Sequence, residues 1–233
     1  MAVILNIETS AEFCSVTLAE NGKIIDSLTE KEERSHASLL AISIEKILKT
    51  NNTPVQKIDA IAISKGPGSY TGLRIGTSTA KGMCYGLNIP LIAVDTLKSM
   101  SFGARQKWLA NNSNENVSFC PMIDARRMEV YFGVYDRNGS QIEPVAAKII
   151  IEKSFEDLFI NNTILFCGNG AEKCKVVLMH ENALFAGPEK SSAKFMIGLA
   201  EAHFKNMVFE DVAYFEPFYL KDFIATTPKN KVL

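Results

Sequence analysis

Histidine, tryptophan and net charge are all scarce in this chain of 233 residues. It has three histidines, one tryptophan and a formal net charge of −1. A protein that binds nucleic acid on its own usually carries a basic patch or stripe, so the charge balance argues against that class. A helical metal pair needs histidines four residues apart. Leu40 follows four residues after His36, and His180 and His203 have no ligand-like spacing, so we expect no metal site.

Cysteine motifs, long apolar runs and a leader sequence are also missing. The five cysteines, at positions 14, 84, 120, 167 and 174, form no Cys-x-x-Cys motif, which favours buried thiols in a reducing compartment. No apolar run approaches the roughly 20 residues of a membrane helix. The start, MAVILNIETS, lacks the charged segment and cleavage site of a signal peptide. We therefore expect a cytoplasmic protein that does not bind a membrane.

Apolar residues make up 47% of the chain, enough for a full core, and they fall into short runs separated by turn signals. Branched or alternating runs predict strands, and longer periodic runs with an N-cap predict helices. The predicted strands are residues 2–8, 13–19, 23–29, 58–64, 90–94, 117–124, 128–135, 142–151 and 163–168. The predicted helices are residues 35–49, about 71–86, 96–110, near 153–159 and from 171.

The two halves of the chain repeat one pattern. Glu8 ends the first strand of one half and Asp124 that of the other, and Asn-Gly turns follow at residues 21–22 and 138–139. Each half reads β-β-β-α-β-α, with a polar break at residues 111–116. We predict two domains, 1–110 and 111–233, in a duplicated ribonuclease-H-like α/β fold. That is the architecture of the actin, Hsp70 and sugar-kinase (ASKHA) superfamily, and the fold alone does not assign an activity.

The stretch SKGPGSYTGLRIGTSTAKG, residues 64–82, sits between a predicted strand and a predicted helix. A Walker A loop would need one more residue between Gly68 and Gly72, followed by Lys-Ser/Thr. A dinucleotide fingerprint would start at Gly66 but finds Thr71 in place of its third glycine. Neither phosphate template matches, although any helix N-terminus can attract an anion.

Two helices of the first half have unusual surfaces. Small residues recur every four positions at Gly72, Gly76, Ala80 and Cys84. Because a glycine inside a helix costs about 1 kcal/mol relative to alanine, we interpret this face as one that another backbone approaches closely. That backbone is either an internal strand or a helix of a second subunit. The helix at 35–49 is apolar over more than one stripe, which indicates burial on two sides.

Two strand-end acids and one glycine turn are candidates for cofactor binding. Glu8 and Asp124 occupy positions that face the cleft in this architecture, where they could hold Mg²⁺ or nucleotide phosphates. The alternative is that each acid caps local backbone amides. The turn CGNGAEK, with Gly168, resembles an adenosine-binding turn but equally fits a plain strand-to-helix turn.

Across nearly its full length the chain resembles the bacterial TsaB (YeaZ) family. The resemblance rests on ILNIETSAEFCSVTL, RSHASLL and above all SKGPGSYTGLRIGTSTAKG. It continues in PLIAVDTL, IDARRMEVYFGVY, CGNGAEK and PFYLKDF. One departure is Glu8, where the family usually has Asp, which weakens the case for metal or nucleotide chemistry there.

The resemblance implies a noncatalytic paralogue of TsaD, the enzyme that moves a threonylcarbamoyl group onto tRNA to form threonylcarbamoyladenosine (t6A). It implies a helix bundle with TsaD, or with a second copy when alone, joined by the small ATPase TsaE. It also implies contact with tRNA only through the complex, no tightly bound cofactor, and an adenine nucleotide shared with TsaD. Carried onto this chain, the partner-binding residues are Ser35, His36, Leu39, Leu40, Ile44, Thr71, Gly72, Leu73, Ile75, Gly76, Thr79, Ala80 and Met83.

Two other functions stay open at this point. A metallopeptidase-like protein, as the likeness to TsaD could suggest, predicts bound metal that depends on His36. An ATP-dependent small-molecule kinase of the same fold predicts Mg-ATP binding that depends on Asp124. We expect a noncatalytic subunit that binds TsaD.

Overall fold

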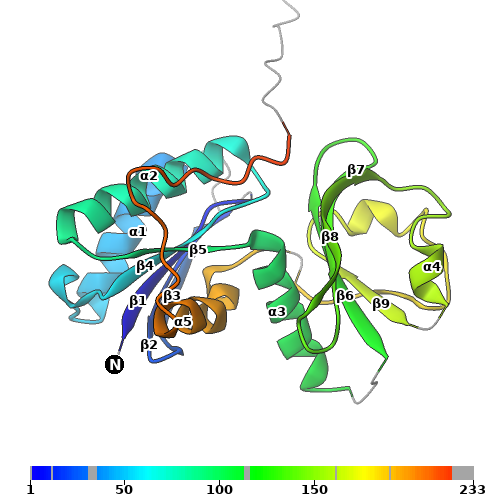
Figure 1. The fold of residues 1–233 in the computed structure, drawn as a ribbon, viewed down its shortest axis with the longest axis horizontal. Coiled ribbons are helices and arrows are strands. Elements are labelled where there is room, and N and C mark those ends of the chain that lie inside the picture. The colour runs from blue at the N-terminus through cyan, green and yellow to red at the C-terminus, as the bar shows by residue number, and fades with distance from the viewer. Residues whose placement is uncertain are drawn as a thin grey trace, which may run out of the picture.

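Two five-stranded sheets with the same topology form the computed structural model (Figure 1). It describes residues 2–11, 13–30, 36–112, 116–160, 162–188 and 190–221, with only the backbone of residues 36–38. The first sheet has the order β3-β2-β1-β4-β5 and the second β10-β9-β6-β7-β8. The strands are β1 (Val3–Glu8), β2 (Cys14–Glu20), β3 (Lys23–Glu30), β4 (Ala60–Ser64), β5 (Leu91–Val94), β6 (Val117–Asp124), β7 (Glu129–Tyr135), β8 (Gln141–Ile149), β9 (Thr163–Cys167) and β10 (Ala183–Phe185).

The internal repeat and the duplicated ribonuclease-H-like fold are confirmed. In each sheet the first strand pairs antiparallel with the second and parallel with the fourth. The first hairpin turns at Asn21 (φ 52°) and Gly22 (φ 74°). Positive φ at both central residues is what a two-residue turn requires if its twist is to match that of the strands.

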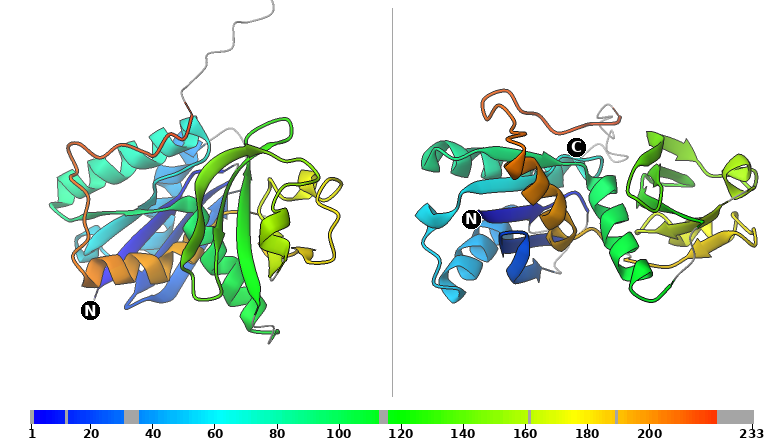
Figure 2. Two further views of the ribbon diagram at one scale, coloured as in Figure 1. Left: turned by 45° about the vertical axis from the view of Figure 1, so that its right-hand side comes forward. Right: turned by 60° about the horizontal axis from the view of Figure 1, so that its bottom comes forward.

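Helices cover both faces of the first sheet (Figure 2). Leu5 and Ile7 of β1 pack under α1 (His36–Thr50) and α2 (Tyr70–Leu87), whereas Ile4 packs with residues of η3 (Ala193–Met196) and α5 (Ile197–Lys205). This alternation follows from the two-residue period of a strand. Helix α3 (Thr96–Leu109) lies between the two halves and packs on β6 and β7. The short elements are η1 (Val55–Lys57), α4 (Glu156–Phe159) and η2 (Glu172–Cys174).

The chain returns to the first sheet after leaving the second. Ala193 donates its backbone N–H to the Ser15 hydroxyl at 2.9 Å, and Ala193, Met196 and Ala200 are buried against the first sheet. Glu210 then forms an antiparallel bridge with Leu91. Packing in this stretch therefore follows the first sheet, although its place in the sequence belongs to the predicted domain 111–233.

Two predicted helices of the second half are shorter than the sequence pattern indicates. Phe155 has φ 71°, a left-handed value, so α4 begins only after it, and its ring is buried against Phe132 and Phe166. The helix predicted from residue 171 is only the short η2, because Leu178 turns back into the core of the second half. Within the described part of the chain, none of the helices has the length and apolarity to span a bilayer.

Candidate partner-binding face

The four-residue spacing in the first half of α2 serves an internal contact. A Cβ on Gly72 would lie 2.0 Å from the Thr9 carbonyl oxygen, and one on Gly76 would lie 2.2 Å from Thr9 Oγ1. The backbone that approaches these glycines is the segment that follows β1. The interpretation that Gly72 and Gly76 form a surface for an external partner is therefore wrong in this conformation, because both residues are buried.

Several backbone amides in and after the loop before α2 donate hydrogen bonds to other groups of the chain. Ser69 is the N-cap, and its hydroxyl accepts a hydrogen bond from the Gly72 N–H. The Ser69 N–H donates to the Ser10 carbonyl at 2.6 Å and the Gly66 N–H to Thr96 Oγ1 at 3.1 Å. The amides of Gly66, Ser69 and Gly72 therefore have partners within the chain.

The solvent side of α2 carries a second set of small residues. Gly82 and Gly86 are exposed, and a Cβ on either would meet nothing within 4 Å. Ser78 and Thr71 extend the same exposed side toward the start of the helix, and Tyr85 beside them is 85% exposed. Nothing inside the described chain accounts for two helical glycines there, and each costs about 1 kcal/mol.

Helix α1 is buried along one stripe and exposes apolar side chains beyond it. Leu40, Ile44 and Ile47 belong to the core under the helix. Leu39 is partly exposed, and the Ile42 side chain is 56% exposed. The excess apolar surface noted in the sequence is therefore real on the described residues, and it is carried by Ile42, which was not among the predicted contacts.

The predicted partner-binding residues divide by burial. Those buried in the chain's own core are Leu40, Ile44, Gly72, Leu73, Gly76 and Ala80. Those that reach the surface wholly or in part are Leu39, Thr71, Ile75, Thr79 and Met83. Ser35 and the side chain of His36 lie outside the described residues. Gly82, Gly86 and Tyr85 are exposed on α2 and were not among the predicted residues; on a helical projection Tyr85 lies opposite Gly76, with Gly82 and Gly86 to one side of it.

Glu8 points into the protein rather than into a cleft. Its side chain is fully buried, and Oε1 accepts hydrogen bonds from the Ser10 N–H at 2.6 Å and the Ser64 hydroxyl at 2.9 Å. Burial raises the pKa of Glu8, and these hydrogen bonds only partly oppose that rise. Oε2 has no partner among the described residues. The carboxyl therefore caps the turn after β1, the local alternative considered for this acid.

Asp124 and Gly168 also have local partners. The Asp124 carboxylate accepts the Arg126 N–H at 2.7 Å and pairs with the Lys173 ammonium. Gly168 has φ 94°, and a Cβ there would lie 2.2 Å from the Met122 carbonyl oxygen. The glycine thus lets the turn lie against β6, a structural reason for it that requires no nucleotide.

Metal-binding chemistry has little support among the residues described. They include no group of three or more His, Cys, Asp or Glu side chains placed to hold a metal ion. The two acids at the strand ends are engaged as above, and the five cysteines are free and buried.

Comparison with known proteins gives one consistent result. The family model of TsaD, tRNA N6-adenosine threonylcarbamoyltransferase, matches residues 23–230. The tRNA threonylcarbamoyladenosine biosynthesis protein TsaB of Escherichia coli K12 is 35% identical over 161 residues, 66% of this chain and 67% of that protein. The protein of the same name from Buchnera aphidicola subsp. Acyrthosiphon pisum is 33% identical over 162 residues, which are 67% of this chain and 70% of that protein. The structure of YeaZ from Pseudomonas aeruginosa has a TM-score of 0.77 at 25% identity and covers 94% of this chain and 100% of its own.

Proposed function

The chain belongs to the TsaB family of tRNA threonylcarbamoyladenosine biosynthesis proteins, and from that premise we propose that it is a noncatalytic scaffold. In this proposal it binds and activates a TsaD-type transferase and recruits a TsaE-type ATPase. It reaches tRNA only through that complex and pairs with a second copy of itself when alone. An adenine nucleotide, if one is shared, lies at the interface with the transferase.

The observation that carries the proposal is the solvent side of α2. Gly82 and Gly86 leave the backbone bare over one turn of an exposed helix, and small residues allow a second helix to pack at the short end of the usual 8–10 Å range. The partly exposed Leu39, Ile75 and Met83, with exposed Ile42, supply apolar surface on the same two helices. The burial of apolar area is the main favourable term in most protein associations.

The similarity to the transferase family supports the choice of partner. The TsaD model matches 23–230, so both proteins share a fold that includes the α1–α2 pair. Two related folds can meet through corresponding surfaces in the way that identical subunits meet across a two-fold axis. The same argument covers a pair of identical chains in the absence of the transferase.

The noncatalytic role is supported by the environment of the strand-end acids. Glu8 is fully buried and bonded to Ser10 and Ser64, while Asp124 is paired with Lys173. A catalytic acid or base must come within hydrogen-bond reach of a reacting group. Glu8 is instead enclosed by the protein, and Asp124 is paired with a neighbouring lysine.

A pair of substitutions at Gly82 tests the docking surface. Gly82→Trp fills the open space with a large ring and should weaken binding of the purified transferase by about 30-fold or more, the scale of an interface hot spot. Gly82→Ala adds only a methyl group and should stay within a few-fold of the wild type. Both should remain folded, because nothing lies within 4 Å of the added Cβ. Transferase binding by Gly82→Trp at wild-type affinity would remove α2 from the interface.

Reconstitution tests the role itself. We expect tRNA modification by the transferase and the ATPase to depend on this chain and to fall with Gly82→Trp in proportion to the lost binding. Saturating amounts of the variant should restore the rate. Modification at the full rate without the chain would refute the activating role.

A further inference from the structure

The last described stretch of the chain, residues 211–221, forms a strap that runs along α2 and then toward the second half (Figure 1). It is called the C-terminal strap below. It follows α5 and the Leu91–Glu210 bridge, so it starts on the first sheet. Both views in Figure 2 place it along the outer edge of α2.

The first part of the strap is anchored firmly to the first half. Phe215 is 9% exposed and belongs to the core under α1 and α2. The Lys81 ammonium on α2 donates hydrogen bonds to the carbonyl oxygens of Ala213 at 3.1 Å and Phe215 at 3.0 Å. A buried ring and two charge-assisted hydrogen bonds fix this segment on the helix.

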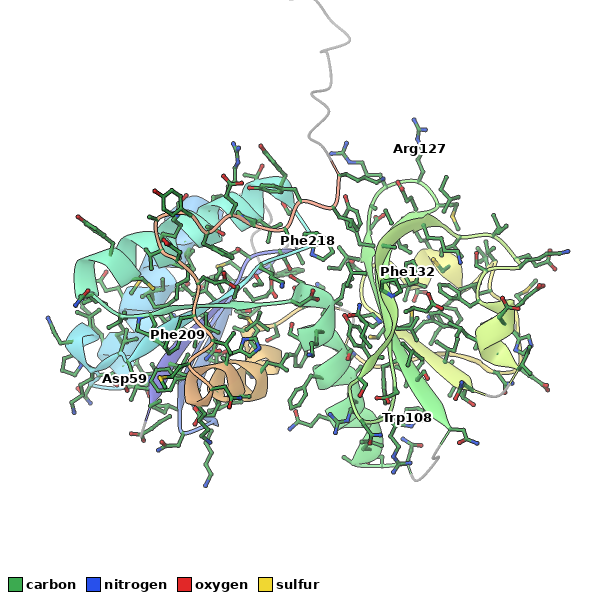
Figure 3. The ribbon with its side chains drawn as sticks, viewed as in Figure 1. Asp59, Trp108, Arg127, Phe132, Phe209 and Phe218 are labelled. Atoms are coloured by element: carbon green, nitrogen blue, oxygen red, sulfur yellow. The ribbon has the colours of Figure 1, made fainter. Side chains whose placement is uncertain are left out.

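The middle of the strap rests on the loop before α2. The Phe218 N–H donates to the Lys65 carbonyl at 2.7 Å. Gly66 has φ 110°, and a Cβ there would lie 2.6 Å from the Phe218 carbonyl oxygen. In Figure 3 Phe218 lies where the strap passes from the first half toward the second. One role of Gly66 is therefore to let the strap lie against this loop.

The end of the strap is the part that reaches the second half. The centre of the Tyr219 ring lies 4.9 Å from that of Tyr70, and the Tyr219 side chain forms a hydrogen bond with Arg74. Tyr70 and Arg74 lie on the first turns of α2. Two residues after Tyr219, Lys221 forms an ion pair with Glu129 of β7, and its ammonium lies 5.9 Å from the centre of the Tyr131 ring. Within the described residues, Lys221 thus connects the strap to the second sheet through an ion pair with Glu129 and a contact with the Tyr131 ring.

Helix α3 makes further contacts between the halves, away from the strap. Helix α3 packs on the second sheet through Leu97 and Met100, and a Cβ on Gly103 would lie 2.4 Å from the ring of Phe195 in η3. Figure 1 shows α3 in the middle of the molecule and the strap crossing above it. This arrangement places a tightly packed pivot at α3 and a lighter link at one edge.

We propose that the C-terminal strap can detach from the second half and so controls how far the two halves open about α3. Its anchors on α2 are buried or bonded several times, whereas the described residues link it to the second half through Lys221, by a surface ion pair and a ring contact. The second half therefore detaches from the strap before the strap detaches from α2. This inference does not depend on the proposed function.

The test measures the distance between the halves in the purified full-length chain. Spin labels on Lys57→Cys and Val176→Cys, both exposed and in opposite halves, report the separation by electron-spin resonance. The doubly labelled parent, diluted in an excess of unlabelled chain so that distances between copies do not contribute, should give one main distance. Lys221→Glu should shift the ratio of open to closed molecules by about five-fold, the upper end for an exposed ion pair. The exchanged pair Lys221→Glu with Glu129→Lys should restore the parent distribution.

Hydrogen exchange of the Phe218 amide separates the possible results. In Lys221→Glu this amide should keep its protection, because its bond to Lys65 lies on the first half. Tyr219→Ala should lower the protection and also broaden the distances. An unchanged distance distribution in both variants would overturn the proposal, whether or not the Phe218 amide exchanges faster. Lys221→Ala provides a second variant without charge reversal and should shift the distances in the same direction by a smaller factor.

Discussion

The two glycine pairs of α2 should respond in opposite directions to the same substitution. Glycine to alanine in a helix interior gains about 1 kcal/mol of intrinsic helix stability. At Gly82 no described atom of the same chain lies within 4 Å of the added methyl group, so this gain should appear in full at concentrations low enough to keep the chain unpaired. For a chain of this size it raises Tm by roughly 2–4 °C.

At Gly72 the same methyl group would lie 2.0 Å from the Thr9 carbonyl oxygen. An ordinary contact of this kind is about 3.4 Å, so backbone on one side must move by more than 1 Å. Such overpacking costs typically 1–3 kcal/mol, and a backbone neighbour places this site at the upper end. After the gain of about 1 kcal/mol in helix propensity is subtracted, the free energy of unfolding should fall by about 2 kcal/mol. Gly76→Ala should lose less, because its nearest neighbour is the Thr9 hydroxyl, a side-chain atom.

Urea unfolding of Gly72→Ala and Gly82→Ala, followed by circular dichroism, measures both effects. The free energies of unfolding of the two variants should differ by about 3 kcal/mol, with similar slopes against urea. Gly86→Ala serves as a matched control and should follow Gly82→Ala, since its Cβ also meets open space. The burial argument is refuted if Gly72→Ala is as stable as Gly82→Ala, or if Gly82→Ala is destabilised.

Two further predictions concern buried ionisable groups. Because burial raises the pKa of Glu8, the folded state holds its proton more tightly than the unfolded state. The stability of the wild type relative to Glu8→Gln should therefore fall as pH rises from about 4.3 through the raised pKa, by up to about 1.4 kcal/mol per pH unit. If the free energies of unfolding of the wild type and Glu8→Gln run parallel against pH, this prediction is contradicted. Burial also raises the pKa of Cys14 and of Cys167 to about 12, so a thiol reagent at pH 8 should label neither until the protein is unfolded. Rapid labelling of the native chain would show that these sites open.

The strands and the repeat could be predicted because their signals are local. Alternating and branched runs define β1 and β2, and Asn21 and Gly22 define the turn between them. The same pattern recurs after residue 116, and this repeat is the basis for predicting a duplicated fold. The start of α2 was also close to its prediction, since Ser69 caps it.

The assignment of faces on α2 could not be predicted from spacing alone. Gly72 and Gly76 are four apart, and so are Gly82 and Gly86. Only packing against Thr9 decides that the first pair is buried and the second open. The choice depends on how the helix is rotated over β1 and β4, which is a property of the whole sheet.

The sequence by itself determined the repeated order of strands, the family and the shortage of metal-binding histidines, because these depend on residue types and on short distances along the chain. The tertiary structure alone decided that Glu8 is buried, that residues 193–215 return to the first sheet and that Lys221 reaches Glu129. Such contacts join residues as far as 178 positions apart, as in the hydrogen bond from Ala193 to Ser15. No local pattern encodes them, because they exist only once both sheets have formed.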